Sequence, residues 1–238
     1  MGPTVRIATQ AALGELVSTI SAAEAYPLWA ETYDHDPNPL VELEHRILKE
    51  RLHLLPGERL IDLATGTGRW LEYALSHGVV ATGADVCPEM LAVAATKHDV
   101  NGRLACADIC ALPFASDSVD VAVCSFALGY IGPLELAFRE MARVAQRIVT
   151  SDLHPDAVLA GWVRSFRTTV GSYQIEHYGH SWPRIEACAN AAGLRLAWRL
   201  DASFGEQEGG LFERSGKADA FIAAQQVPAV LISMWVRG

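Results

Sequence analysis

Residues 59–68 read Arg-Leu-Ile-Asp-Leu-Ala-Thr-Gly-Thr-Gly, and this stretch decides the fold. An apolar run ends at the carboxylate of Asp62, and the chain then turns through Gly66 and Gly68 into the helix-forming stretch 69–75. A strand, a tight turn and a helix start in this order bring backbone N–H groups against a ligand, because the first N–H groups of a helix have no partner within it. The stretch therefore predicts a ligand site at the end of a strand.

A second acidic residue extends this pattern. Asp85 closes the run 81–86, about 20 residues after the turn, where a carboxylate that binds ribose hydroxyls is expected. Leu71 occupies the position at which a dinucleotide-binding turn has its third glycine, which weakens a pyrophosphate interpretation.

The composition indicates one large domain, or one domain with a small lid. The chain has 238 residues, of which 50% are hydrophobic and 20% charged, so it can bury a sizeable core. The formal charge is −9, from 19 basic and 28 acidic residues, and no basic run occurs. A nucleic-acid partner is therefore not expected, since phosphate binding favours a basic face.

Cysteine usage and hydropathy indicate a cytoplasmic protein. The five cysteines are odd in number and form no C-x-x-C pair, which is typical of reduced thiols and not of a zinc cluster or a disulfide framework. Residues 1–9 lack the features of a signal peptide, and the apolar stretches are shorter than the roughly 20 residues of a membrane helix. We expect a soluble protein without a membrane partner, and the sequence leaves its oligomeric state open.

Beyond the turn, short β-branched runs alternate with helical stretches. Helices are expected notably over 88–97 and 133–145, and strands near 59–63, 79–84, 103–107, 119–126 and 147–153. This alternation implies right-handed crossovers and a parallel sheet with helices on both faces. Two later strand candidates, 195–200 and 229–236, bring the expectation to an α/β fold with a mostly parallel seven-stranded sheet.

The same pattern divides the chain into segments. Helices expected over 9–25 and 40–54 make residues 1–56 a helical N-terminal cap. The remaining segments are a core over 57–153, a substrate lid over 154–180, and a C-terminal part of the core over 181–238, which contains a helix over 181–192 and an insertion at 201–226 that we expect to belong to the lid.

The ordered signatures resemble the S-adenosylmethionine (SAM) site of Rossmann-like methyltransferases. The pattern Asp62-x-Ala64-x-Gly66-x-Gly68 is followed by the acidic strand end at Asp85 and by a third signature over 107–128. The chain is similar to class I SAM-dependent methyltransferases of the small-molecule group that includes the ubiquinone/menaquinone-type (methyltransferase type 11) enzymes. The resemblance covers roughly residues 26–200 and implies SAM as the cofactor.

The resemblance also implies roles for individual residues. Asp62 would lie near the methionine ammonium, Asp85 would accept from the ribose hydroxyls, and Asp108 from the adenine amino group. The other residues implied to contact SAM are Tyr33 as an aromatic cap, Val86, Met90 and Ile109 as apolar walls, the Ser125 carbonyl, and the backbone of Ala64, Gly66 and Gly68. Asp85 and Asp108 could instead be ordinary turn residues, and Tyr33 could pack into the core.

Departures from the family pattern bear on the acceptor. Residues 128–130 read Leu-Gly-Tyr where family members commonly have histidine, and no Asn-Pro-Pro-Tyr motif or Mg²⁺ ligand set follows the fourth strand. These features favour a small-molecule acceptor methylated on oxygen or carbon, without a metal. Aromatic residues in the expected lid weakly favour an aromatic or natural-product acceptor.

Three histidines are candidates for a general base. His154 follows the fifth strand of the expected core, and His177 and His180 lie in the lid segment. A histidine of near-neutral pKa suits proton removal as the methyl group arrives. They could alternatively bind a metal or be ordinary loop histidines. Two other functions stay open: a non-catalytic SAM-binding module that acts through a partner, and an NAD-dependent oxidoreductase.

Overall fold

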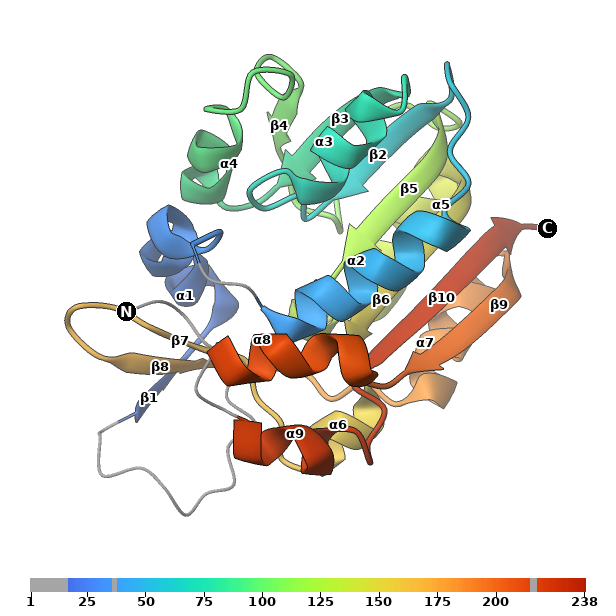
Figure 1. The fold of residues 1–238 in the computed structure, drawn as a ribbon. Helices are drawn as coiled ribbons and strands as arrows, with labels where there is room; N and C mark the ends of the chain where they lie inside the picture. The colour runs from blue at the N-terminus through green and yellow to red at the C-terminus, as the bar shows by residue number, and fades with distance from the viewer. Residues whose placement is uncertain (1–16, 36–37, 215–217) are drawn as a thin grey trace.

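The central element of the computed structural model is a seven-stranded sheet, and the structure describes residues 17–35, 38–214 and 218–238. The strand order is β4-β3-β2-β5-β6-β10-β9, and only β10 runs antiparallel to its neighbours (Figure 1). The strands are β2 (Arg59–Leu63), β3 (Val80–Asp85), β4 (Leu104–Cys106), β5 (Val119–Ser125), β6 (Ala145–Leu153), β9 (Leu194–Ala202) and β10 (Val230–Arg237). The expected α/β Rossmann-like fold with seven mostly parallel strands is confirmed.

Helices cover both faces of this sheet, because its strands are apolar on both sides. On one face lie α2 (Pro39–Arg51) and α3 (Arg69–Ser76), and on the other α5 (Leu134–Val144) and α7 (Trp182–Ala191) (Figure 1). Successive side chains of β5 alternate between the two cores: Val121 and Val123 belong to the α2 and α3 side, Ala122 and Cys124 to the α5 side.

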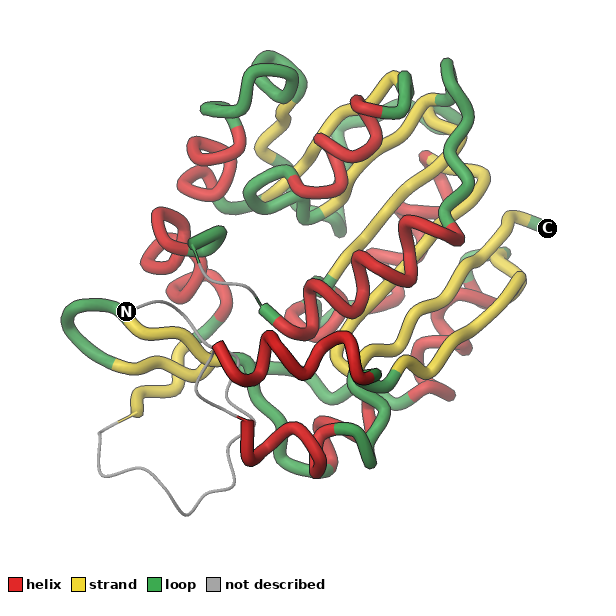
Figure 2. The backbone as a smooth tube through the Cα atoms, in the orientation of Figure 1, coloured by secondary structure: helices red, strands yellow, loops and turns green. Residues whose placement is uncertain are grey.

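A smaller sheet stands apart from the large one (Figure 2). Its order is β1-β8-β7, with β1 (Val17–Ile20) parallel to β8 (Ser172–Ile175), and β8 antiparallel to β7 (Ser165–Arg167). The expected N-terminal cap and the expected lid are therefore joined by backbone pairing. Next to this sheet, α1 (Ala22–Trp29) packs against α4 (Pro88–Ala94) and β8.

The helix expected over 9–25 is confirmed over 22–25 and wrong over 17–20, and its earlier part lies outside the described residues. Residues 17–20 form β1 because β8 offers them a pairing edge. The helix begins only after Ser21, whose hydroxyl accepts from the N–H of Glu24 while the Glu24 carboxylate accepts from the N–H of Ser21.

The expected insertion at 201–226 packs on the α2 side of the core. It contains the short helices η3 (Glu206–Glu208), α8 (Gly209–Arg214) and α9 (Ala218–Ala224). Arg46 of α2 binds Glu208 with an N–O distance of 2.8 Å, and Phe212 and Phe221 join the core on the α2 side. The remaining short helices are η1 (Ala30–Thr32), η2 (Leu128–Tyr130) and α6 (Pro155–Leu159). No described helix combines the length and the apolar character that crossing a membrane requires.

One buried carboxylate ties α2 to the sheet. Glu44 is fully buried, and its Oε1 accepts from the hydroxyls of Ser125 and Ser151 at 2.8 and 2.7 Å and from Trp70 Nε1 at 3.2 Å. Its Oε2 lies 2.8 Å from Nη1 of Arg69. The ends of β5 and β6 and the start of α3 thus share one acceptor.

Substitution of this carboxylate should make the folded protein less stable. Glu44→Ala leaves Arg69 and two buried hydroxyls without their acceptor, so the free energy of unfolding should fall by about 3–5 kcal/mol. Glu42→Ala, at an exposed position of the same helix, is the matched control and should stay within about 0.5 kcal/mol of wild type. Urea unfolding measures both, and equal effects of the two substitutions would contradict the assignment.

Candidate active site

A cavity of about 610 Å³ opens at the carboxyl ends of β2, β3, β4 and β5. This is the edge at which parallel α/β sheets bind their ligands. The wall opposite the strand ends comes from α1 and from the segment that follows it, which supply Tyr26, Pro27 and Tyr33. Residues from distant parts of the chain therefore enclose one space.

The turn after β2 is held by the buried carboxylate of Asp62. Its Oδ2 accepts from the hydroxyl of Thr65 at 2.6 Å and from the N–H of Leu71 at 3.1 Å, so it ties the turn to the first residues of α3. Positive φ angles at Ala64 (53°), Gly66 (56°) and Gly68 (89°) bend the backbone sharply. Burial raises the pKa of Asp62 to about 7. Asp62 also lines the cavity.

The turn sits directly against β3. A side chain at Gly83 would bring its Cβ within 2.8 Å of Thr65 Oγ1, so only glycine permits this approach. At the end of the strand, Asp85 Oδ2 accepts from the N–H of Gly66 and Oδ1 from that of Cys87, both at 2.8 Å. Burial raises the pKa of Asp85 above its ordinary value. Each carboxylate oxygen keeps a lone pair for a ligand.

Most of the residues expected to contact a cofactor line this cavity. Those that do are Tyr33, Asp62, Ala64, Gly66, Asp85, Val86, Met90, Asp108, Ile109 and Ser125. Gly68 does not; it precedes the first residue of α3, and a Cβ there would contact Ala94 and Val100. Asp108 is exposed and accepts from the N–H of Cys110 at 2.8 Å. The structure brings these residues together, and their individual roles stay predictions.

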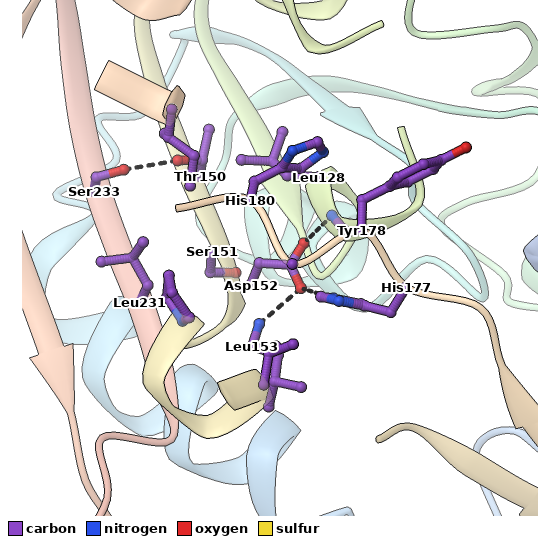
Figure 3. A pocket seen from close by; sticks show the side chains of 15 residues that line it. Leu128, Thr150, Ser151, Asp152, Leu153, His177, Tyr178, His180, Leu231 and Ser233 are labelled. Atoms are coloured by element: carbon purple, nitrogen blue, oxygen red, sulfur yellow. Dashed lines mark hydrogen bonds and ion pairs between the residues drawn. The ribbon is translucent and has the colours of Figure 1, made fainter. Parts of the chain in front are cut away.

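The three candidate histidines lie elsewhere. His154 is 3% exposed and caps α6: its Nδ1 accepts from the N–H of Asp156 at 3.1 Å, and its Nε2 lies 3.1 Å from Oδ1 of Asp201. His177 and His180 line a separate cavity of about 20 Å³, which has room for about one water molecule (Figure 3). None of the three lines the large cavity, so their positions do not favour a general base among them.

His177 instead belongs to a buried cluster around Asp152 (Figure 3). Burial opposes the charge on Asp152, yet the interaction with His177 Nε2 at 3.4 Å and the N–H groups of Gly129 and Leu153 lower the pKa of Asp152 below its ordinary value. A Cβ at Gly129 would come within 1.9 Å of His177 Nε2. The cluster therefore fixes the segment after β8 to the end of β6.

Several cavity residues were not anticipated from the sequence. Among them are Arg69, Trp70, Phe126 and Tyr130, whereas Tyr26 belongs to the aromatic segment in which Tyr33 was the favoured cap. Arg69 and Trp70 begin α3 directly after the glycine turn, and Phe126 follows the last residue of β5. Their positions in the sequence could therefore have predicted that they line the cavity. The aromatic residues expected in the lid pack elsewhere: Trp162 on Phe204, Phe166 on Trp29, Tyr178 on His180 and Trp182 on Trp235.

Comparison with known proteins agrees with this geometry. Residues 61–147 match a family described as "Methyltransferase domain". The chain is 37% identical over 98 residues to the demethylmenaquinone methyltransferase of Corynebacterium urealyticum, which covers 41% of each chain. It is 34% identical over 126 residues to the ubiquinone/menaquinone biosynthesis C-methyltransferase UbiE of Bdellovibrio bacteriovorus, which covers 49% of this chain and 54% of the relative. The chain thus spans about half the length of the curated relatives it matches.

A solved structure shows the same fold over a longer stretch. The SAM-dependent methyltransferase from Mesorhizobium loti superposes with a TM-score of 0.65 at 20% identity, covering 82% of this chain and 98% of that one. Fold and cavity together define a class I methyltransferase architecture. Residues 61–147 are thus similar in sequence to this methyltransferase family, and the solved structure has the same fold as the chain.

The raised pKa of Asp62 predicts a pH-dependent stability. The folded pKa of about 7 exceeds the ordinary value of 3.8, so the folded protein favours the neutral carboxyl. Asp62 therefore contributes stability that is fully present below about pH 4 and is lost as the pH rises through about 7. Asp62→Asn should flatten this part of the profile, because the amide oxygen can accept from Thr65 and Leu71 at every pH. Urea unfolding across this range, with the exposed Asp99→Asn as control, measures the difference; parallel profiles for wild type and Asp62→Asn would refute it.

Proposed function

We propose that the protein transfers the methyl group of SAM to an oxygen or carbon atom of a small-molecule acceptor. One observation carries this proposal: the glycine turn, Asp85 and the pair Asp108 and Ile109 line a single cavity together with an aromatic wall. The glycine turn and the acidic residues suit a cofactor that contains a nucleoside. The aromatic residues suit an acceptor bound beside that cofactor.

The residues of the strand ends would hold SAM by complementary polar contacts. Asp85 keeps lone pairs for the two ribose hydroxyls, and Asp108 for the adenine amino group, with Val86, Met90 and Ile109 beside the ring. Asp62 would face the methionine ammonium, and a nearby cation would favour its charged form. The turn would contribute backbone groups that only a glycine leaves accessible.

The chemistry is an in-line displacement at the sulfonium methyl. The sulfur loses its bond to the methyl carbon while the acceptor atom forms one, so S-adenosylhomocysteine is the second product. Catalysis would come from holding the acceptor atom in line with the C–S bond at close approach in a cavity from which water is excluded. Because none of the three candidate histidines lines the cavity, we do not assign a protein general base.

An aromatic acceptor fits the cavity best. The cavity lining also contains Tyr26, Tyr33, Phe126 and Tyr130, whose rings can stack on a planar molecule. The curated relatives quoted above are named demethylmenaquinone methyltransferase and ubiquinone/menaquinone biosynthesis C-methyltransferase, and a quinone ring is planar. A quinone-like ring is therefore the first acceptor class to screen.

Calorimetry with SAM, S-adenosylhomocysteine and NAD tests the function directly. We expect low-micromolar binding of the first two, on the order of −8 kcal/mol, and none of NAD. Preferential binding of NAD would favour the oxidoreductase instead. Binding of SAM without turnover of any acceptor in the screen would favour the non-catalytic module.

Asp85→Ala should weaken SAM binding by about 2–3 kcal/mol, which is the scale of a lost pair of charge-assisted hydrogen bonds. The same substitution frees the N–H of Gly66 and of Cys87, so circular dichroism must first show that the fold is kept. Calorimetry measures the affinity, with the exposed Asp99→Ala as control. An unchanged affinity of the Asp85 variant for SAM would show that Asp85 does not bind the ribose hydroxyls.

His154→Ala should affect stability more than turnover. Loss of the cap on α6 should cost about 1 kcal/mol of unfolding free energy, while kcat with an acceptor found by the screen should change by less than about tenfold. Urea unfolding and steady-state kinetics measure the two effects. A fall in kcat of about 10²–10⁴ with SAM affinity unchanged would instead make His154 the base.

A further inference from the structure

Arg164 is a buried cation beside the cavity. It precedes β7 and is 1% exposed. Its Nη1 donates to the hydroxyl of Tyr26 at 3.4 Å and its Nη2 to that of Tyr33 at 3.2 Å, whereas its Nε has no hydrogen-bond partner among the described residues. In the part of the chain that the structure describes, no aspartate or glutamate forms an ion pair with it.

The charge of this guanidinium is not neutralised by its neighbours. Arginine stays protonated in proteins. Burial raises the pKa of Tyr26 well above its ordinary value, so this neighbour is a neutral phenol. The rings of Trp29 and Phe126 lie 5.7 and 5.2 Å from the guanidinium carbon, and such contacts offset only part of the several kcal/mol that desolvation of an ion costs. A positive charge is therefore available to a ligand.

Tyr26 and Tyr33 lie between this charge and the cavity. Tyr26, Tyr33 and Phe126 line the cavity, and Arg164 lies behind them. A hydroxyl that accepts a hydrogen bond from a guanidinium still has its own O–H to donate, and the first bond strengthens the second. The hydroxyl of Tyr33, together with that of Tyr26, which also interacts with Tyr130, is backed by a cation, and such hydroxyls form a site for a negatively charged oxygen.

We propose that Arg164, Tyr26 and Tyr33 form an anion subsite for the methyl acceptor, which would therefore be an acidic molecule: a carboxylate or an ionised phenol. This inference rests on the proposed function. Asp85 and Asp108 also line the cavity and would repel an anionic acceptor, whereas Arg69, the cation that lines it, is already paired with Glu44.

The cofactor has a carboxylate of its own, and that carboxylate is the other possible occupant. We assign the subsite to the acceptor because the cofactor carboxylate can bind elsewhere. The N-terminus of α3, which follows the glycine turn expected to hold SAM, is a favourable position for a carboxylate. The experiment must tell these two sources apart.

Calorimetry on the 238-residue chain saturated with S-adenosylhomocysteine tests the assignment. The probes are benzoate and 4-nitrophenolate, each against a neutral counterpart, benzamide and 4-nitroanisole. Wild type should bind at least one anion more tightly than its neutral counterpart by about tenfold or more. Arg164→Met and the double variant Tyr26→Phe/Tyr33→Phe should lose this preference, and the exposed control Arg139→Met should keep it. The tyrosine variant keeps the test decisive if Arg164→Met does not fold.

A second titration compares S-adenosylhomocysteine with 5′-methylthioadenosine, which lacks the amino-acid part. If Arg164→Met or the tyrosine variant weakens the first ligand about tenfold or more and leaves the second unchanged, the subsite holds the cofactor carboxylate and our assignment is overturned. Absence of an anion preference in wild type also overturns it. If wild type binds neither adenosine compound, the proposed function fails, and the anion titration on the unliganded protein then decides the subsite alone: a preference that Arg164→Met abolishes supports it, and no preference refutes it.

Discussion

The buried carboxylate of Asp62 is the interaction on which the rest of the site depends. By accepting from Thr65 and Leu71, it fixes both the turn after β2 and the first residues of α3. The turn can then pass against β3 at Gly83, and its N–H at Gly66 meets the carboxylate of Asp85. Two acidic strand ends are thus coupled through one turn, so a change at either one reaches the other.

The part of the fold that the sequence predicts best is the part that is built locally. The strand, turn and helix over 59–76 are adjacent in the chain, and Asp85 follows within one crossover, so the pattern of residues is enough to place them. The strand at 17–20 was missed because its partner, β8, lies more than 150 residues further along the chain. Pairing at that distance leaves no mark on the periodicity of a four-residue segment.

The same difference between local and long-range contacts explains why the surroundings of His154 and Arg164 could not be predicted from the sequence. His154 was placed correctly at the end of a strand, but its ring turns to cap α6 and to reach Asp201 on another strand, which depends on contacts that the local sequence does not contain. Arg164 stands in no motif. Its surroundings form only where α1, the end of η1 and η2 bring Tyr26, Tyr33 and Tyr130 around it, and such convergence cannot be predicted from spacing.

The cavity lining consequently has two parts of different origin and different charge. The strand ends supply the carboxylates of Asp85 and Asp108, near Arg69, which is paired with Glu44, and segments far apart in the chain supply aromatic rings with the unpaired cation of Arg164 behind them. SAM carries its positive sulfonium next to the group it donates, so under the proposed function the acidic part attracts the donor and the part backed by Arg164 attracts an acidic acceptor. Different fields in these two parts give two ligands a preferred order along the cavity, and electrostatic complementarity of this kind governs orientation more than affinity. Since the transfer requires alignment within a fraction of an ångström, the separation of charge between the two parts is itself part of the positioning on which the chemistry relies.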